Sequence, residues 1–316
     1  MLDLSIIIVS WNVADLLAAC LDSVLSGTMQ VGDPEGDQLD IEIIVVDSAS
    51  TDDTVLMVEE RYPQVKLLRQ SENLGFSHCN NIGLSAASGR NILLLNPDTE
   101  IVGNALPRMA GYLDDNAAVG IVGPQTLNSD GTVQSTRRRF PTVPLAFFES
   151  TWLQPYTPQA WLNRYVVADA PDDAILDVDW VQGSALMLRR EVYEQIGGLD
   201  TGFVMYSEEL DWCKRAKNAG WRVVYLGTAQ IVHHGGKSSE QVVGRKHVYF
   251  QESKLRYFRK HHGSMVAFLL RGFLLLSYVW QIGLETGKSL LGNKRQMRRE
   301  RIKAYWQVVR SGLKAR

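Results

Sequence analysis

The sequence has few cysteines and no secretory leader, and each absence excludes a class of protein. The three cysteines, Cys20, Cys79 and Cys213, are odd in number and widely spaced, which predicts free thiols in a reducing cytosol rather than disulfides. Their spacing also fits no zinc motif. The apolar run at residues 4–10 has no positive leader and is too short for a signal peptide, so we expect a core strand there.

A glycine-rich phosphate loop is also missing from the first expected strand-to-helix turn. The turn reads Val9-Ser10-Trp11-Asn12, and no glycine occurs between Ser10 and Leu16. Nicotinamide and flavin dinucleotide folds need glycine there so that a pyrophosphate can approach the helix, and a nucleotidyltransferase on a related sheet would need a similar loop. The turn therefore argues against both classes.

Net charge and length leave several architectures open. The 316 residues carry a net charge of only -2, which favours neither nucleic acid nor a strongly acidic partner. Hydrophobic residues make up 45% of the chain, enough for a core, and the length suits two domains or one large α/β unit with an appendage. We predict a first domain over residues 1–262 and a helical region over residues 263–316.

Short β-branched runs alternate with helix-patterned stretches in the first half of the chain. This alternation is typical of βαβ units around a mostly parallel sheet flanked by helices, and so predicts the α/β class. The glycine- and aspartate-rich residues 27–40 are expected to form an exposed insertion. The expected strands are residues 5–9, 41–46, 65–69, 92–95 and 119–122, and the expected helices are residues 14–25, 54–61 and 80–88.

The pattern is weaker after residue 134. Residues 135–177 lose clear periodicity, and their Trp152, Tyr156 and Trp161 belong either to an acceptor-binding excursion or to a packed irregular linker. Beyond them, we expect strands over 178–188, 221–225 and 229–232, and helices over 190–196, 208–219 and 248–260.

Three acidic turns stand out because each lies at the end of an expected element. Asp47 ends an apolar strand before Ser48-Ala49-Ser50-Thr51-Asp52, Asn96-Pro97-Asp98 ends another, and Glu208-Glu209-Leu210-Asp211 begins a helix. Open α/β sheets place their chemistry beyond the carboxyl ends of the strands. Three such turns suit a site that holds a metal, a nucleotide diphosphate and an acceptor.

Each of these segments also has a purely structural interpretation. Asp47 either accepts a hydrogen bond from a nucleotide or belongs to a helix-capping turn. Asp98 either supplies a charged oxygen to Mg²⁺ or Mn²⁺ or marks a strand end. The acidic cluster at residues 208–211 is either catalytic or a solvated first helical turn stabilised by the helix dipole. The segment His233-His234-Gly235-Gly236-Lys237-Ser238 either contacts a metal or phosphate or is structural.

The order and spacing of these segments are specific when taken together. They are Ile8-Val9-Ser10-Trp11-Asn12, Val45-Val46-Asp47-Ser48, Glu72-Asn73-Leu74-Gly75-Phe76 with Asn80-Asn81-Ile82-Gly83, Leu94-Leu95-Asn96-Pro97-Asp98, Gly183 to Arg190, Gly197-Gly198-Leu199-Asp200, Tyr206 to Asp211, and His233-His234-Gly235-Gly236. In these segments the chain resembles the inverting glycosyltransferases of family 2 with a GT-A fold, particularly the bacterial rhamnosyltransferase-like branch. The resemblance spans residues 5–238.

The resemblance implies a metal-dependent transfer from a nucleotide sugar. By it, Asp47 would read the nucleotide base, and Asp98 and His233 would anchor a diphosphate bound to Mg²⁺ or Mn²⁺. Glu209 would deprotonate the acceptor hydroxyl, with Glu208 and Asp211 as further catalytic candidates. Asn-Pro-Asp replaces the commoner Asp-x-Asp, and Glu208-Glu209 replaces Glu-Asp. The implied donor-binding residues are Ser10, Trp11, Asn12, Asp47, Ser48, Asn73, Gly75, Phe76, Asn80, Asn96 and Asp98.

The implied donor is dTDP-L-rhamnose or a UDP-hexose, and the implied acceptor is a glycan or lipid-linked saccharide in cell-envelope polysaccharide assembly. The substitution of glutamate at Glu209 leaves one alternative open. In it, the protein is a catalytically idle, nucleotide-sugar-binding subunit of a membrane-bound assembly complex.

The carboxy-terminal region combines an apolar run with a basic cluster. Residues 265–282 are interrupted only by Arg271, and basic residues recur from Lys288 to Arg316 against a single acid, Glu300. The run is short for a membrane span, so we expect an interfacial helix that holds the enzyme peripherally on the cytoplasmic face of an anionic membrane. The alternative is a helix pair that packs on the catalytic domain or forms a homo-oligomer interface.

Overall fold

Two compact units make up the chain. The computed structural model describes residues 2–28, 39–235, 243–292 and 294–314. Met1–Phe140, Val166–Thr201 and Glu209–Ser238 form the first unit, and Pro141–Tyr165, Gly202–Glu208 and Ser239–Arg316 form the second. Most of the expected insertion at 27–40, and Gly236, Lys237 and Ser238 of the expected phosphate-contacting segment, lie outside the described residues. The domain boundary after residue 262 stays a prediction.

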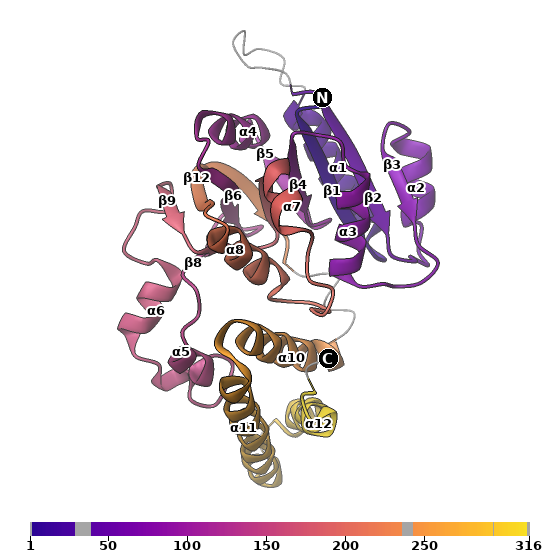
Figure 1. Cartoon of the computed structure of the whole chain (residues 1–316). Coiled ribbons are helices and arrows are strands. Elements are labelled where there is room, and N and C mark those ends of the chain that lie inside the picture. Colours follow the sequence, from indigo (N-terminus) through magenta and orange to yellow (C-terminus); the bar gives the residue numbers. More distant parts are fainter. Residues whose placement is uncertain (1, 29–38, 236–242, 293, 315–316) are drawn as a thin grey trace. The chain divides into compact units, whose positions relative to one another are not determined.

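Ten strands of the described residues form the central sheet of the first unit (Figure 1). Their order is β3-β2-β1-β4-β11-β6-β12-β5, with β7 beside β6 and β9 beside β12. The strands are β1 (Leu4–Ser10), β2 (Ile41–Asp47), β3 (Lys66–Arg69), β4 (Asn91–Leu95), β5 (Thr99–Val102), β6 (Val119–Leu127), β7 (Val133–Gln134), β9 (Ile175–Val178), β11 (Ala185–Arg189) and β12 (Arg222–His233). A separate antiparallel pair consists of β8 (Arg137–Arg138) and β10 (Trp180–Val181).

The β3-β2-β1-β4 half of the sheet is parallel throughout. Its register sets Ser10 opposite Asp47 and Ile8 opposite Leu95, so the carboxyl ends of β1, β2 and β4 lie at one edge. β11 runs antiparallel to β4, and its first residue Ala185 pairs with Leu95 at that same edge. In the other half, β12 is parallel to β6 and antiparallel to β5. The predicted α/β fold is confirmed.

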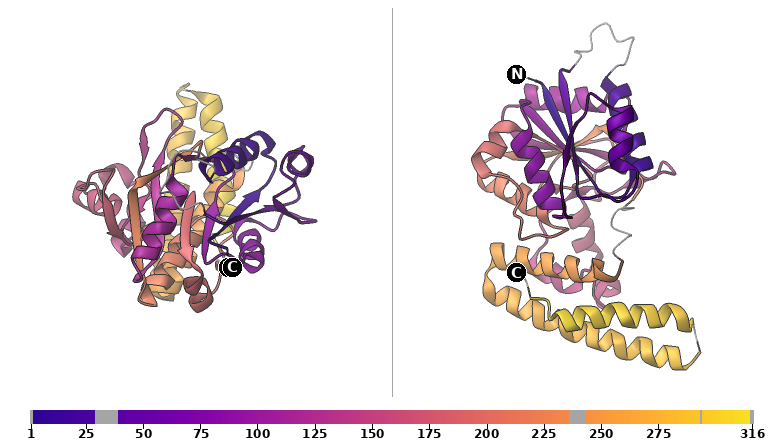
Figure 2. Two further views of the ribbon diagram at one scale, coloured as in Figure 1. Left: turned by 90° about the horizontal axis from the view of Figure 1, so that it is seen from above. Right: turned by 90° about the vertical axis from the view of Figure 1, so that its right-hand side faces the viewer.

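Helices cover both faces of this sheet (Figure 2). One face buries side chains of α1 (Ala14–Thr28), α2 (Thr54–Arg61) and α4 (Ala105–Asp115). The other buries side chains of α3 (Phe76–Ala86), α7 (Arg190–Ile196) and α8 (Glu208–Asn218).

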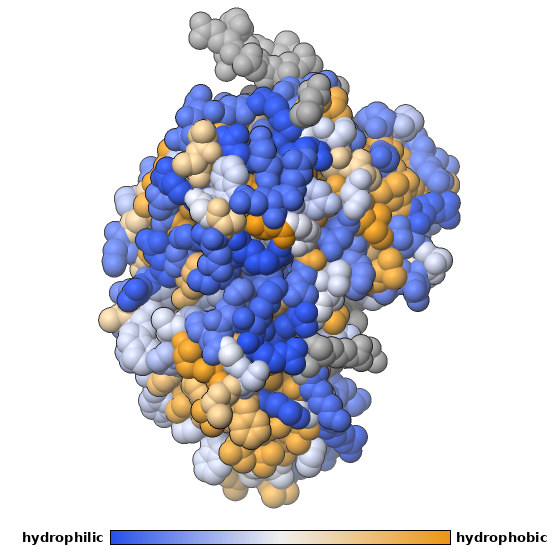
Figure 3. Space-filling model, in the orientation of Figure 1, coloured by the Kyte–Doolittle hydropathy of each residue, from blue (hydrophilic) through white to orange (hydrophobic). Residues whose placement is uncertain are grey.

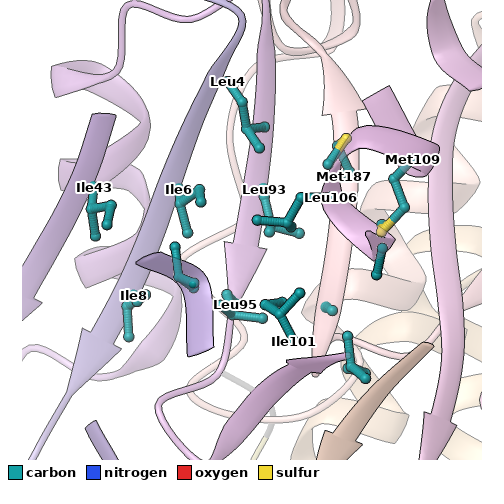
Figure 4. Packing of buried hydrophobic residues seen from close by; sticks show 14 of the residues in the cluster. Leu4, Ile6, Ile8, Ile43, Leu93, Leu95, Ile101, Leu106, Met109 and Met187 are labelled. Atoms are coloured by element: carbon teal, nitrogen blue, oxygen red, sulfur yellow. The ribbon is translucent and has the colours of Figure 1, made fainter. Parts of the chain in front are cut away.

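Within β1 the side chains alternate between these two faces. Leu4, Ile6 and Ile8 belong to the first cluster, shown in Figure 4, whereas Ile7 belongs to the second. Successive strand residues point to opposite faces. Because both faces are covered, a continuous apolar run is needed instead of an alternating one.

Two expected strands differ in the structure. The single strand expected over 178–188 is wrong, because the chain breaks at Asp179, before β10, and again at residues 182–184, before β11. Asp179 bonds to the β8 segment: its N–H donates to Arg138 O at 2.9 Å and its Oδ2 accepts from Phe140 N at 2.9 Å. At the second break, Gln182 N donates to Thr136 O at 3.1 Å. The two short strands expected after residue 220 are one strand, β12, whose pairing register with β6 shifts between Leu226 and Gln230. The three cysteines are free, as predicted, and the structure also buries them.

The second unit is helical, and its carboxy-terminal helices confirm the prediction of a helical extension. Its helices are α5 (Val143–Phe148), the 3-10 turn η1 (Gln154–Tyr156), α6 (Gln159–Val166), α10 (Val243–His262), α11 (Ser264–Leu290) and α12 (Arg295–Ser311). α11 and α12 lie side by side (Figure 2), joined by a buried ion pair in which Arg298 donates to Glu285 at 2.7 Å.

Candidate active site

Two turns with unusual backbone follow β1 and β2. Asn12 has φ 53 and Ala49 has φ 60, a region that residues other than glycine seldom adopt and that persists where the surroundings enforce it. The turns hold each other: Ser50 Oγ accepts from Asn12 N at 2.9 Å, and Asn12 Oδ1 accepts from Thr51 N at 2.7 Å. Such enforced strain at the carboxyl edge of a parallel sheet is typical of a binding site.

Asp47 and Ser10 end neighbouring strands with buried polar atoms that lack partners. Asp47 Oδ2 accepts from Ser50 N at 3.0 Å, but its Oδ1 and the Ser10 Oγ have no hydrogen-bond partner among the described residues. At the start of α2, Thr54 N donates to Asp52 Oδ1 rather than to Asp47, and the N-cap residue Asp53 makes no side-chain capping bond. A buried polar atom without a partner costs about 1–3 kcal/mol, so these two atoms indicate a ligand with hydrogen-bonding groups.

Hydrogen bonds connect the residues that surround the carboxyl edge of the sheet. Asn73 Oδ1 accepts from Ser48 Oγ at 3.2 Å and from Gly75 N at 3.0 Å. Gly75, with φ 81, then starts α3, where Asn80 Nδ2 donates to Phe76 O at 3.0 Å. The structure thus links most of the predicted donor-binding residues through hydrogen bonds, while Trp11 lies half-buried in the turn after β1.

The pairing of β5 with β12 brings Asp98 and His233 together. Thr99 pairs with His233, and Asp98 Oδ1 lies 3.4 Å from His233 Nε2, with both side chains buried. Gln134 fixes the imidazole: its Nε2 donates to His233 O at 2.8 Å, so its Oε1, 3.0 Å from His233 Nδ1, accepts the Nδ1 proton. Nε2 is therefore the ring nitrogen that faces the Asp98 carboxylate.

A cation between Asp98 Oδ1 and His233 Nε2 would bind both atoms, so this pair fits a metal ion. Their 3.4 Å separation suits neighbouring ligands of one cation with metal–ligand distances of about 2.0–2.1 Å. Among the described residues no three His, Cys, Asp or Glu side chains gather. The remaining ligands would come from phosphate and water, as is usual for Mg²⁺.

His234 has a different environment. Its Nε2 lies 2.6 Å from Glu100 Oε1 and its Nδ1 lies 2.7 Å from Ser129 Oγ. Both ring nitrogens are therefore occupied by the protein, and His234 serves the structure.

α8 places Glu209 against the backbone of Gly183, just before β11. A Cβ at Gly183 would lie 3.5 Å from Cβ and Cγ of Glu209, and the next residue, Ser184, accepts from Asn96 N at 2.9 Å. Burial raises the pKa of Glu209 above its ordinary value of 4.5, although nearby backbone N–H groups oppose the shift. Its Oε2 has no hydrogen-bond partner among the described residues. These are the properties of a general base.

The other two carboxylates of α8 are buried, which removes the interpretation of a solvated helical turn. Asp211 Oδ2 accepts from Arg215 Nε at 2.9 Å, and the same guanidinium donates to the carbonyls of Ile196 and Gly198. This network ties α8 to the turn after α7. Catalytic roles for Glu208 and Asp211 stay predictions.

Comparison with known proteins decides the family. A sequence model described as glycosyl transferase family 2 matches residues 5–197, more than half of the chain. The chain belongs to glycosyl transferase family 2. It is therefore a glycosyltransferase, and the matched region covers the turns after β1, β2 and β4.

Sequence relatives include two rhamnosyltransferases. An N-acetylglucosaminyl-diphospho-decaprenol L-rhamnosyltransferase of Mycobacterium tuberculosis is 28% identical over 211 residues, which cover 63% of this chain and 68% of that protein. A rhamnosyltransferase of Escherichia coli (strain K12) is 25% identical over 203 residues, which cover 58% of this chain and 69% of that protein.

Solved structures with low sequence identity share the fold. A mannosyltransferase from Pyrobaculum calidifontis in complex with GDP-Man and Mn²⁺ aligns with TM-score 0.54 at 17% identity, covering 98% of this chain and 88% of that one. GalNAc-T7 with UDP, GalNAc and Mn²⁺ aligns with TM-score 0.57 at 14% identity, covering 82% of this chain and about half, 48%, of that one.

Sequence reasoning missed one residue of this family 2 site. Gln134 orients His233 from the two-residue strand β7. An isolated glutamine in so short a strand carries no signal that sequence alone could detect.

Asp47→Ala is expected to weaken binding of UDP or dTDP by roughly ten- to a hundredfold, because a hydrogen bond to a charged group contributes about 1.5–3 kcal/mol. Thermal stability should be nearly unchanged. Calorimetric titration measures the affinity. Asp52→Ala is the matched control: it removes the contact with Thr54 and should lower stability but leave nucleotide affinity intact. Unchanged affinity of the Asp47 variant would assign base recognition to another residue.

Proposed function

We propose that the protein transfers a sugar, L-rhamnose or a hexose, from a nucleoside diphosphate donor to a glycan or lipid-linked saccharide in cell-envelope polysaccharide assembly. The observation that carries this proposal is the 3.4 Å approach of Asp98 Oδ1 to His233 Nε2, at the edge where Asp47 Oδ1 and Ser10 Oγ have no hydrogen-bond partner among the described residues. A divalent cation that carries a diphosphate would bind to Asp98 and His233. The nucleoside would form hydrogen bonds with Asp47 Oδ1 and Ser10 Oγ.

Glu209 supplies the chemistry on the acceptor side. Its raised pKa and bare Oε2 suit removal of a proton from the acceptor hydroxyl as that oxygen attacks the anomeric carbon. The nucleoside diphosphate leaves from the opposite face of the sugar, so the configuration inverts and no covalent enzyme intermediate forms. Bound Mg²⁺ or Mn²⁺ at Asp98 and His233 would stabilise the charge on the departing diphosphate.

The relatives and the second unit support the choice of substrates. The names of both bacterial relatives specify rhamnose, and one specifies a lipid diphosphate saccharide as acceptor. In the second unit, Trp152, Tyr156 and Trp161 are 42%, 71% and 41% exposed. Large exposed aromatic side chains that the core does not need are available for an acceptor saccharide.

A screen of nucleotide sugars for hydrolysis tests the proposal, because slow transfer to water needs no acceptor. We expect release of nucleoside diphosphate from one class of donor, with dTDP-L-rhamnose and UDP-hexoses tried first, only when Mg²⁺ or Mn²⁺ is present. Tight donor binding without any turnover, even with candidate acceptors, would instead support the idle-subunit alternative.

We also propose that the enzyme lies peripherally on the cytoplasmic face of the membrane through α11 and α12. α11 has the length and apolar composition of a membrane span, yet its exposed apolar residues follow one helical face while the opposite side packs inward. On the face shown in Figure 3, apolar side chains gather over α11. The exposed residues of this apolar stripe are Met265, Phe268, Leu269, Leu276, Val279, Trp280 and Leu284.

Charges near the apolar stripe favour an interfacial position over a full crossing. Arg271 lies away from it and donates from Nε to Gly312 O at 2.7 Å, so it joins α11 to the end of α12. α12 carries an exposed face formed by Arg295, Arg299, Lys303, Trp306 and Arg310, at helical spacing. Cations near an anionic surface contribute about 1 kcal/mol each. An apolar stripe beside a basic helix with tryptophan is typical of interfacial binding.

Leu276→Glu is expected to weaken binding to anionic vesicles at least about tenfold, because it removes the burial of one leucine, worth about 1.5–3 kcal/mol. Flotation with vesicles measures the bound fraction. Leu56→Glu is the matched control, since Leu56 is similarly exposed but lies on α2. A protein that never floats, or a Leu276 variant that only changes oligomeric state, would favour the homo-oligomer alternative.

A further inference from the structure

A half-open cavity of about 260 Å³ lies within the second unit, at the start of α11. Three cations and four apolar side chains line it together with one serine, and no carboxylate is among the lining residues. The lining residues are Leu255, Arg259, Ser264, Ala267, Phe268, Arg271, Leu313 and Lys314. The volume is below the range of about 300–1,000 Å³ typical of sites for larger ligands, so it suits a single small anionic group.

The positive charge of this cavity has more than one source. The two terminal nitrogens of Arg271 have no hydrogen bond to any described residue, since only its Nε is engaged by Gly312 O. α11 begins at the cavity, and its N-cap Gly263 offers no side chain to the first N–H groups. The amino end of a 27-residue helix adds partial positive charge and free donors. Arginine forks and helix amino ends are the groups that bind phosphate.

The apolar wall indicates where the rest of the ligand lies. Phe268 lines the cavity and also belongs to the exposed apolar stripe, being 69% exposed, beside Met265 and Leu269. A phosphate in the cavity can therefore remain attached to a hydrocarbon chain that lies along α11. Free phosphate would make no use of Phe268, whose side chain is exposed beside the cavity.

We propose that this cavity binds the phosphate head group of an anionic membrane lipid, with phosphomonoester lipids preferred. The inference rests on the proposed membrane attachment and deepens it. Diffuse electrostatic attraction would bind lipid head groups of equal charge equally, whereas a cavity lined by three cations would select among them.

Vesicle binding by the full chain tests the site. Phosphatidylcholine vesicles containing phosphatidic acid are compared with vesicles containing phosphatidylserine at equal surface charge. We expect wild type to bind the phosphatidic acid vesicles about tenfold more tightly. Ser264→Leu fills the cavity from an exposed position without changing charge and should abolish the preference, as should Lys314→Gln. Arg299→Gln, which removes an exposed cation of α12 outside the cavity, should weaken both affinities equally.

Each other outcome has a distinct meaning. Equal binding of both vesicles by wild type, or a preference that survives Ser264→Leu, would overturn the site but leave membrane attachment standing. Absence of binding to either vesicle would contradict attachment itself. Inorganic phosphate that binds as tightly as the phosphatidic acid vesicles would overturn the assignment to a lipid.

A second and independent feature is the loop Gly202–Glu208, which directly precedes Glu209 and belongs to the second unit. Tyr206 and Ser207 have φ 70 and φ 64, two consecutive non-glycine residues in the left-handed region, each costing about 1–2 kcal/mol. Such strain persists only where neighbouring groups enforce it.

α10 supplies these groups. Ser253 Oγ donates to Met205 O at 2.7 Å, and the Arg256 guanidinium lies 5.3 Å from the centroid of the buried Phe203 ring. A Cβ at Gly202 would overlap that guanidinium. Phe250 packs edge-on against Tyr206, with ring centroids 5.8 Å apart. The loop is thus held along its length by one helix.

We infer that Ser253 and Arg256 are positioning residues for the carboxylates at the start of α8. The inference rests on Glu209 as the base, which Glu209→Gln tests separately. Without the Ser253 hydroxyl, Met205 O loses its hydrogen bond, and the backbone of Tyr206 and Ser207 can relax to negative φ. Glu209, which follows in the chain, is then displaced, whereas the residues that bind the donor keep their positions.

Ser253→Ala is expected to lower kcat about tenfold or more with the donor KM unchanged, since small misplacement of a catalytic group is costly. Ser253→Thr retains the hydroxyl and should restore most of kcat. Lys246→Ala, an exposed change on α10, should have no effect. A fall in kcat that threonine does not rescue, or a parallel rise of the donor KM, would overturn the positioning role.

Discussion

Asp98→Ala is expected to lower donor hydrolysis by at least about a thousandfold, because a bound cation contributes several kcal/mol of transition-state stabilisation. Asp98 is the only carboxylate that faces His233 Nε2 within the described residues. The rate of nucleoside diphosphate release, measured across a range of Mn²⁺ and Mg²⁺ concentrations, gives the size of the effect.

Glu100→Gln is the matched control for this variant. Glu100 lies two residues away and its carboxylate is engaged by His234 at 2.6 Å, so the change removes a nearby negative charge without touching the proposed ligand pair. We expect near-normal hydrolysis. If the wild-type protein kept full activity in excess chelator, the assignment of a metal ion to Asp98 and His233 would be contradicted.

Glu209→Gln should reduce turnover by about 10²-fold or more, because the amide is nearly isosteric but cannot accept a proton. Donor affinity should stay near that of wild type. Glu208→Gln is expected to be milder. The reversed ranking would make Glu208 the base, and equal activity in both variants would direct attention to Asp211 or to the idle subunit.

The raised pKa of Glu209 gives a pH signature in wild type. Activity should fall as pH drops through this pKa, above the ordinary value of 4.5, since the protonated carboxyl cannot act as a base. Stability changes in the opposite sense: a raised pKa in the folded state stabilises the protein at low pH and this contribution is lost as pH rises. Glu209→Gln should therefore raise the melting temperature at neutral pH, with the difference shrinking on acidification.

The parallel half of the sheet could be predicted from sequence because its pattern is local. β1, β2 and β4 are apolar runs separated by helix-patterned stretches, and each ends where a polar turn begins. The breaks in the expected strand at 178–188 could not be predicted, because Asp179 and Gln182 bond there to residues about forty positions away in the sequence. β12 reads as two strands because Gly227 and Thr228 interrupt its apolar pattern where the register shifts.

In the candidate site too, sequence predicted the residues that are defined by their position after a strand, but not the contacts that depend on strand pairing. Asp47 and Asp98 could be chosen from their positions after strands, and the structure places both at the carboxyl edge. The sequence offered His233 only as part of a segment that either contacts a metal or phosphate or is structural, because its approach to Asp98 depends on the pairing of β12 with β5. The position of Arg271 away from the apolar stripe could not be predicted either, because it depends on the contact between Arg271 and Gly312 at the end of α12.

Binding of Mn²⁺ followed by electron paramagnetic resonance tests the central claim most directly. With Asp98 and His233 as the two ligands from the described residues, the cation should bind weakly to the protein alone and at least about tenfold more tightly with UDP or dTDP, because the diphosphate supplies the remaining ligands. Asp98→Ala should remove this coupling, and Glu100→Gln should retain it. Nucleotide binding that is identical with and without Mn²⁺ would contradict the account.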